Sequence, residues 1–227
     1  MKDGLGAGRL EVIAGPMFAG KSEELLRQVR RAEVAHRGVL VVSHALDARR
    51  GVGRVSSHSG QGVPSRTVSD AADIPALLES GPGPGPGPGP GPGPATGPGP
   101  GPATGPATAI ELVAIDEAQF FGAGLVPVVS DLAGRGLVVV VAGLSVTFDG
   151  QPFSPLPELM ALAESVRKLT AVCSVCGADA AFHVRVPGAP PVPDAGGAGP
   201  GGALVPVAAH VGGAESYEAR CRRHQTE

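Results

Sequence analysis

Residues 9–22 read Arg9-Leu10-Glu11-Val12-Ile13-Ala14-Gly15-Pro16-Met17-Phe18-Ala19-Gly20-Lys21-Ser22, and this stretch decides the fold. It begins as an apolar segment that suits a buried strand. It continues as Gly-x-x-x-x-Gly-Lys-Ser and runs into a helical pattern that extends to about His36. A strand, a glycine-rich loop and a helix in this order predict a P-loop, and hence a site for a nucleoside triphosphate.

The residue types of this loop suit phosphate binding. Gly15 and Gly20 allow backbone conformations that a Cβ disfavours, so that backbone N–H groups can turn toward a phosphate. The start of the following helix adds a partial positive charge. We expect Lys21 to reach the β- and γ-phosphates and the Ser22 hydroxyl to hold Mg²⁺. The alternative, an ordinary glycine-rich turn, is weakened by the complete strand–loop–helix order.

The composition limits the possible classes of protein. The 227 residues suffice for one domain and a smaller appendage. The net charge of −3, without a large basic block, argues against binding to a nucleic-acid backbone. We find no apolar run of membrane-spanning length and no secretory leader at the N-terminus. We therefore expect a cytoplasmic protein that is not attached to a membrane.

Further apolar runs predict a doubly wound parallel sheet. Continuous apolar segments at 39–42 and 137–143 are typical of strands that are buried on both faces, and the mostly apolar segment at 110–115 predicts another buried strand. Helical patterns alternate with them, which indicates an α/β fold of the P-loop, RecA-like kind, with helices on both faces of the sheet. The other elements that we predict are helices at 21–36, 71–79, 122–133 and 157–165 and a strand at 168–172.

Polar residues follow two of the predicted strands. Asp116 and Glu117 end the strand at 110–115 and resemble a Walker B element, in which Asp116 orients Mg²⁺ and Glu117 accepts a proton. Asp47 and Arg49 follow the strand at 39–42 and are candidate ligand residues, because strand ends of this kind face the ligand crevice. For both pairs a solvated polar loop is the alternative interpretation.

Two other segments predict surface features. Arg27, Arg30 and Arg31 lie on one side of the first helix, and we expect a solvated helix face there. Residues 81–109 repeat Gly-Pro with Ala-Thr interruptions and carry almost no apolar side chains. Such a segment is expected to be a disordered insertion in a loop of the first domain, which we place at residues 1–172.

The three cysteines and one histidine of the C-terminal segment form two paired-ligand knuckles, Cys173-x-x-Cys176 and Cys221-x-x-His224. Alternating apolar stretches at 181–186 and 203–211 lie between the knuckles and predict a β-ribbon. Three thiolates and one imidazole suit a closed, structural Zn²⁺ site. We therefore predict a small zinc-ribbon domain at residues 173–227. Buried cysteines without a metal are the alternative.

These motifs together resemble the cytosolic, zinc-containing thymidine kinase family, in particular its bacterial members. The order and spacing of the motifs match as well as their residue types. The matching segments are Gly15-Pro16-Met17-Phe18-Ala19-Gly20-Lys21-Ser22, Asp47-Ala48-Arg49, Asp116-Glu117-Ala118-Gln119-Phe120-Phe121, residues 162–173 and Gly212-Gly213-Ala214-Glu215-Ser216-Tyr217.

The resemblance implies a reaction and a set of site residues. Family members transfer the γ-phosphate of ATP to the 5′-hydroxyl of thymidine with Mg²⁺, and Glu117 corresponds to their general base. Gln119 would belong to the nucleotide site. A lasso loop between the knuckles would hold the base largely through backbone groups. The nucleoside pocket would be formed by Met17, Phe120, Leu144, Phe148, Ala208, Ala209, His210, Val211, Gly212 and Tyr217.

Some residues depart from the family pattern. Ser145 and Val146 stand where many relatives carry Asp-Gly, and His183 replaces a small hydroxyl residue near the pocket for the thymine methyl group. The resemblance also implies a homotetramer, with ATP and thymidine as partners, and the charge argues against a nucleic-acid partner. A different hypothesis is a P-loop ATPase whose zinc ribbon binds nucleic acid or a protein. The ribbon is poor in basic and aromatic residues, which favours the kinase.

Overall fold

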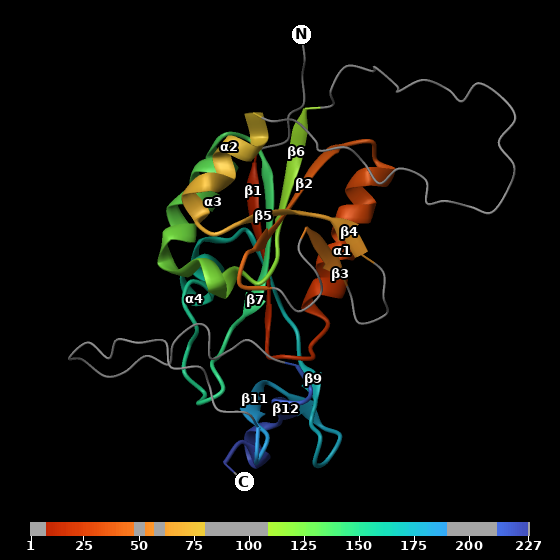
Figure 1. Ribbon diagram of the computed structural model, residues 1–227, viewed down its shortest axis with the longest axis vertical. Coiled ribbons are helices and arrows are strands. Elements are labelled where there is room, and N and C mark those ends of the chain that lie inside the picture. Colours follow the sequence, from red (N-terminus) through yellow and green to blue (C-terminus); the bar gives the residue numbers. More distant parts are fainter. Residues whose placement is uncertain (1–7, 48–52, 57–61, 80–108, 190–212, 227) are drawn as a thin grey trace, which may run out of the picture.

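The computed structural model describes residues 8–47, 53–56, 62–79, 109–189 and 213–226 (Figure 1). The predicted insertion at 81–109 lies outside these residues, apart from Ala109. In the described part of the chain, every helix is too short or too polar to cross a membrane.

A six-stranded sheet forms the centre of the molecule, and all its strand pairs are parallel. The strand order is β5-β2-β6-β7-β1-β8, so the strand that leads into the phosphate loop lies inside the sheet. This confirms the predicted doubly wound sheet. The strands are β1 (Arg9–Gly15), β2 (Gly38–His44), β5 (Arg66–Val68), β6 (Ile110–Ile115), β7 (Val138–Leu144) and β8 (Ser165–Lys168).

Helices cover both faces of the sheet (Figure 1). On one face lies α1 (Lys21–Val34), together with a hairpin of β3 (Arg54–Ser56) and β4 (Gly62–Pro64). On the other face lie α2 (Ile74–Glu79), α3 (Leu125–Gly134) and α4 (Leu156–Leu162). The 3₁₀ turns are η2 (Ala71–Asp73), η3 (Ala118–Gly124) and η5 (Arg222–His224).

The side chains of the central strands alternate between two cores. In β7, Val139 and Val141 pack on the face of α3 and α4, whereas Val140 and Ala142 pack on the face of α1. Strands that bury both faces show continuous apolar runs, which explains why these segments were recognisable in the sequence. The rigid sheet brings the strand ends that carry Gly15, Asp116 and Leu144 to one edge.

The chain after α4 differs from the expected helix at 157–165 and strand at 168–172. The helix ends at Leu162, and Ser165–Lys168 joins the central sheet as β8, parallel to β1. Ala171–Val172 then forms β9, which pairs with β10 (Asp179–Ala180) in a separate small sheet. The predicted strand was misplaced because two short strands of different sheets follow each other within eight residues.

The C-terminal module contains the predicted ribbon with a different second strand. β11 (Phe182–Arg185) pairs antiparallel with β12 (Tyr217–Arg220). The stretch at 203–211, which we expected to supply a strand, lies outside the described residues. Cys173 and Cys221 pack with Ala171, Ala180 and Ala219 in a core of small side chains.

Gly143 in β7 allows close packing above the site. A Cβ at this position would lie 2.8 Å from Leu156 Cδ2 and 2.9 Å from Gln119 Oε1. We expect Gly143→Ala to lower the free energy of unfolding by about 1–3 kcal/mol, because both neighbours must shift. Urea unfolding measures this change. In the control Gly134→Ala the new Cβ meets no atom within 4 Å, so its stability should equal or exceed that of the wild type.

Candidate active site

The phosphate loop connects β1 to α1. Phe18 and Gly20 both adopt left-handed conformations, with φ of 66° and 79°, so the loop turns sharply before the helix begins at Lys21. The Lys21 ammonium donates a hydrogen bond to the Pro16 carbonyl at 2.7 Å. Gly15 is required by space, since a Cβ there would lie 2.7 Å from the Leu169 carbonyl oxygen. The loop thus has the backbone of an anion-binding turn, with a lysine folded over it.

Asp116 lies at the carboxyl end of β6, beside the start of α1. The Ser22 hydroxyl donates to Asp116 Oδ1 at 3.3 Å, and the backbone N–H of Glu117 donates to the same oxygen at 3.0 Å. Burial, together with the charges of Glu117 and Asp47, raises the pKa of Asp116 to about 7, although the hydrogen bonds from Ser22 and the Glu117 N–H oppose the shift. A buried carboxylate beside a hydroxyl is a donor set that suits Mg²⁺.

Glu117 follows in a conformation that is unusual for its residue type, with φ of 51°. Backbone strain of this kind is concentrated at functional sites. Its carboxylate accepts a hydrogen bond of 2.5 Å from Gln119 Nε2. Gln119 is completely buried, and its Oε1 accepts from the backbone N–H of Leu144 at 3.0 Å. Gln119 therefore orients the Glu117 carboxylate and connects it to the end of β7.

An apolar and aromatic cluster lies next to this point. It contains four of the expected pocket residues, Met17, Leu144, Phe148 and Tyr217, together with Phe153. The rings of Phe148 and Tyr217 are tilted, with centroids 6.2 Å apart. His183 is fully buried and meets Tyr217 edge-on at 5.8 Å. Tyr217 lies on β12, so the C-terminal module contributes directly to this cluster.

The structure places Phe120 apart from this cluster. Its ring is nearly buried and lies 6.0 Å from the ring of His44. Asp47 is described and lies close enough to raise the pKa of Asp116. Arg49 and the expected lasso residues Ala208, Ala209, His210, Val211 and Gly212 lie outside the described residues.

Sequence reasoning missed two residues near the site. Phe153 completes the apolar cluster. In the sequence it follows Gln151-Pro152 in a loop, which gives only a weak indication that its side chain is buried. His44 ends β2 and is buried, with 6 % of its surface exposed. The backbone N–H of Leu46 donates to His44 Nδ1 at 3.0 Å, so Nε2 carries the proton and donates to the Ser69 carbonyl, also at 3.0 Å. His44 thus holds the loop that leads to Asp47.

His44 predicts a pH dependence of stability. Burial lowers the pKa of His44, although the Ser69 carbonyl and the charges of Asp47 and Asp70 oppose the shift. A lowered folded-state pKa means that this contribution is complete above the unfolded-state value and is lost as the pH falls below it. Below about pH 6.5 we expect His44 to lower the free energy of unfolding with a slope of at most about 1.4 kcal/mol per pH unit, while the raised pKa of Asp116 contributes with the opposite sign, so the His44 effect is read from the difference between variant and wild type.

Urea unfolding between pH 7.5 and 5 measures this effect. His44→Gln should show a shallower loss of stability on acidification than the wild type. The matched control is His36→Asn, at an exposed position with φ of 56° that asparagine accepts. The explanation is wrong if the His44→Gln and wild-type curves stay parallel over this range.

Cys173, Cys176, Cys221 and His224 converge in the C-terminal module, and their ligand atoms all lie within 4.8 Å of one another. Cys176 Sγ and Cys221 Sγ are 3.8 Å apart, and His224 Nδ1 lies 3.7 Å from Cys173 Sγ and 3.3 Å from Cys221 Sγ. A tetrahedron with Zn–S bonds of about 2.3 Å has edges of about 3.8 Å. The cluster therefore fits a structural zinc ion, as predicted.

The surroundings of the cluster lower the pKa of Cys173 and Cys221 and so favour their thiolates, the form that binds metal, whereas the neighbouring thiols of Cys173 and Cys221 raise the pKa of Cys176. Desolvation alone would raise the pKa of Cys173. Backbone N–H groups of Cys221, Cys176 and Val175 and the His224 ring outweigh it and lower the pKa to about 5. The sequence spacing had indicated the ligands, and the fold supplies these N–H groups.

Comparisons with known proteins agree with this site. A family model described as thymidine kinase matches residues 8–80 and 103–225. The chain is 42 % identical to a thymidine kinase of Deinococcus deserti over 225 residues, which covers 99 % of this chain and 97 % of the relative. It is 40 % identical to a thymidine kinase of Bdellovibrio bacteriovorus, over 96 % of this chain and 85 % of that relative. A thymidine kinase of Halobacterium salinarum is 38 % identical over 95 % of this chain and 93 % of its own length.

Proposed function

Because the chain belongs to the thymidine kinase family, we propose that it transfers the γ-phosphate of ATP to the 5′-hydroxyl of thymidine, giving dTMP and ADP. One observation carries the proposal. A chain of hydrogen bonds runs from Ser22 through Asp116, Glu117 and Gln119 to the backbone of Leu144. It links the phosphate loop to the cluster that contains Met17 and Tyr217.

In this proposal the phosphate side of the site works by positioning and charge. The loop N–H groups and Lys21 bind the β- and γ-phosphates, and the hydrogen bond from Lys21 to the Pro16 carbonyl gives way to the phosphate. Ser22 and Asp116 are the residues that would hold Mg²⁺. When bound, Mg²⁺ neutralises charge that develops on the phosphoryl oxygens.

Glu117 acts as the general base in this proposal. Its carboxylate accepts the proton of the 5′-hydroxyl as that oxygen attacks the γ-phosphorus and ADP leaves. Gln119 keeps the acceptor oxygen in place through its hydrogen bond. The thymine base would lie against Met17, Leu144, Phe148 and Tyr217, where the backbone of residues 208–212 would complete the pocket. The resemblance also supports a cytoplasmic homotetramer.

Phosphate transfer to a panel of acceptors tests the proposal. The panel contains thymidine, deoxyuridine, deoxycytidine and a sample without nucleoside, each with Mg²⁺ and labelled ATP. We expect labelled dTMP in clear excess over the other products. Hydrolysis of ATP at a rate that no nucleoside changes would contradict the proposal and would favour an ATPase with a zinc ribbon.

A further inference from the structure

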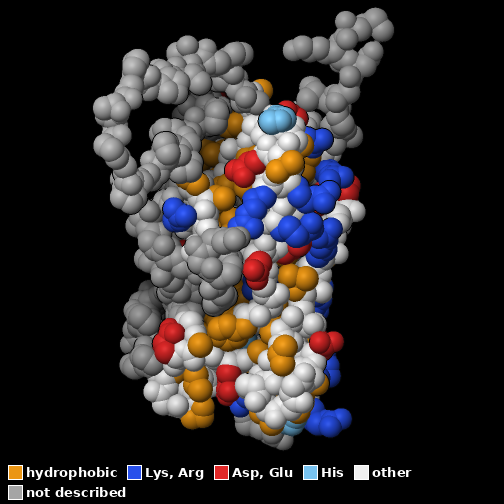
Figure 2. Space-filling view, turned by 90° about the vertical axis from the view of Figure 1, so that its right-hand side faces the viewer, with side chains coloured by type: hydrophobic (Ala, Val, Ile, Leu, Met, Phe, Trp, Pro, Cys, Tyr) orange, Lys and Arg blue, Asp and Glu red, His pale blue; other side chains and the backbone are white. Residues whose placement is uncertain are grey.

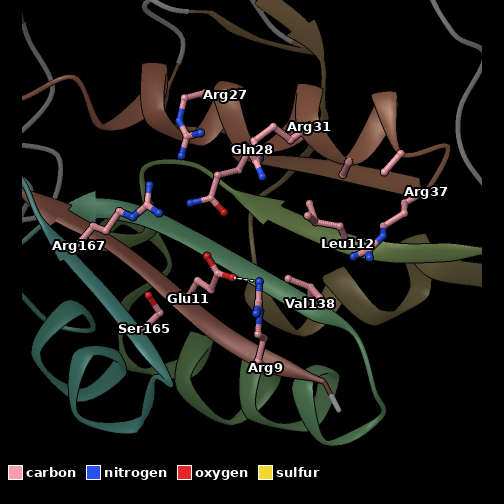
Figure 3. A pocket seen from close by; sticks show the side chains of 12 residues that line it. Arg9, Glu11, Arg27, Gln28, Arg31, Arg37, Leu112, Val138, Ser165 and Arg167 are labelled. Atoms are coloured by element: carbon pink, nitrogen blue, oxygen red, sulfur yellow. Dashed lines mark ion pairs between the residues drawn. The ribbon is translucent and has the colours of Figure 1, made fainter. Parts of the chain in front are cut away.

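An open cavity of about 600 Å³ lies between α1 and the edge of the sheet, outside the site described above (Figure 3). Its lining comes from α1 and Arg37, from the first residues of β1, from β8, and from Leu112 on β6 and Val138 on β7. Among the described residues, α1 is the only helix on this face, and it covers Ile13 of β1 but leaves the strip of sheet formed by Arg9, Glu11 and β8 open to the cavity. The phosphate loop is at the opposite end of β1.

Polar side chains replace the usual apolar ones on this strip. Glu11 on β1 is paired in register with Ser165 on β8, and Arg167 follows two residues later. The next residue of β1 on the same face is Ile13, which is fully packed beneath α1. The change from Ile13 to Glu11 and Arg9 marks the point where the sheet surface passes from core to cavity.

Five arginines from separate parts of the fold surround the cavity. They are Arg9, Arg27, Arg31, Arg37 and Arg167, and the only carboxylate in the described lining is that of Glu11. Figure 3 shows Arg27 and Arg31 reaching from α1 toward the side of the cavity where Arg167 and Glu11 point. Figure 2 shows the same concentration of basic side chains on the molecular surface over α1. The cavity therefore has a clear excess of positive charge.

The internal ion pairs leave part of this charge uncompensated. Glu24 accepts hydrogen bonds from Arg27 at 2.6 and 2.7 Å and also pairs with Arg167, so one carboxylate serves two guanidinium groups. Glu11 pairs with Arg9 at 2.5 Å. The side chain of Arg31 forms no ion pair or hydrogen bond with any other described side chain. Arg37 reaches Glu111 only at 4.0 Å.

We propose that this cavity binds a compact polyanion that carries two or three linked phosphates. Guanidinium groups offer paired donors that match phosphate oxygens, and the five at this cavity outnumber the three carboxylates that pair with them, those of Glu11, Glu24 and Glu111. The cavity is large enough for such a ligand, and its lining suits a charged group better than an apolar one, because polar side chains outnumber apolar ones such as Leu112 and Val138. A free polyphosphate and the phosphate tail of a nucleotide share this chemistry.

Isothermal titration calorimetry with inorganic tripolyphosphate tests the proposal on the full-length, zinc-loaded protein. The titrations use Lys21→Ala, so that the phosphate loop contributes little to the signal. We expect one binding event that weakens as the salt concentration rises, since counterions are released. Adding Arg31→Gln and Arg167→Gln should weaken binding by about tenfold or more, because each charge-assisted hydrogen bond is lost.

The matched control adds Arg30→Gln to Lys21→Ala, because Arg30 is exposed on the same helix and does not line the cavity. Its affinity for tripolyphosphate should stay within about twofold of the Lys21→Ala background, as expected when no direct contact is removed. Thermal unfolding and zinc content verify that each variant is folded. Equal affinities for the Arg31/Arg167 and Arg30 variants, or no binding to folded Lys21→Ala protein, would overturn the proposal.

Two further experiments identify the chemical nature of the ligand and the place where it binds. Tighter binding of ATP than of tripolyphosphate to the Lys21→Ala protein would show that a nucleoside is part of the ligand, whereas equal binding would indicate phosphate alone. Phenylglyoxal labelling followed by mass spectrometry should show that tripolyphosphate protects Arg31 and Arg167. The site would be contradicted if tripolyphosphate protected neither arginine. It would also be contradicted if both arginines were already protected without any polyanion, because a second copy of the chain covers them.

Discussion

Glu117→Gln is expected to abolish most phosphate transfer while the protein still binds ATP. The substitution keeps the size of the side chain and removes its ability to accept a proton in the transition state. General-base catalysis typically contributes about 10²–10⁴-fold, so kcat should fall by a factor in this range. Stopped assays with labelled ATP give kcat, and equilibrium binding of an ATP analogue gives the affinity, which should change little.

Glu111→Gln is the matched control, because it makes the same change in the same strand. Glu111 is half-exposed at the start of β6 and its nearest cationic partner is Arg37 at 4.0 Å. This variant should retain the turnover of the wild type. If Glu117→Gln also retained it, Glu117 would have no role as base. A loss of ATP affinity equal to the loss of kcat would instead assign Glu117 to nucleotide binding.

Cys221→Ser is expected to remove zinc and to destabilise the C-terminal module. The core of this module consists of alanines and cysteines, so little apolar surface is available to stabilise it without the metal. In small zinc modules the bound ion is worth about 10 kcal/mol or more of folding free energy. We expect zinc content well below one ion per chain, a lower unfolding temperature, and a raised KM for thymidine because Tyr217 loses its support.

Metal analysis and thermal unfolding measure the first two effects, and steady-state kinetics measures the third. Ser174→Ala is the control within the same knuckle, since Ser174 lies between Cys173 and Cys176 and its hydroxyl contacts Glu218 rather than the ligand atoms. It should keep its zinc. A Cys221→Ser protein with a full complement of zinc would rule out the four-ligand site.

The sequence predicted the parts of the site that short motifs determine. The phosphate loop, the Asp116-Glu117 pair and the two pairs of metal ligands were all recognisable because the spacing within each motif is local. Contacts between distant segments could not be predicted in this way. Examples are the hydrogen bond from Leu144 N–H to Gln119 Oε1 and the insertion of Phe153 into the pocket cluster.

The arginines of α1 show a second limit of sequence reasoning. Arg27, Arg30 and Arg31 were expected on a solvated helix face, and all three are exposed. Only the tertiary structure shows which of them line the cavity. Arg27 and Arg31 do so together with Arg167 of β8, whereas Arg30 does not. The position of β8 was itself not predicted, since a four-residue strand directly after a helix has no clear periodic pattern.

The junction between the end of α2 at Glu79 and the start of β6 at Ile110 has a practical use. Because β6 runs parallel to β1, Ile110 lies at the sheet edge opposite to Asp116, about 20 Å away for a strand of this length. The family match is also interrupted there, between residues 80 and 103. This junction is therefore a suitable place to insert a fluorescent reporter or an affinity tag, remote from the nucleotide and zinc sites.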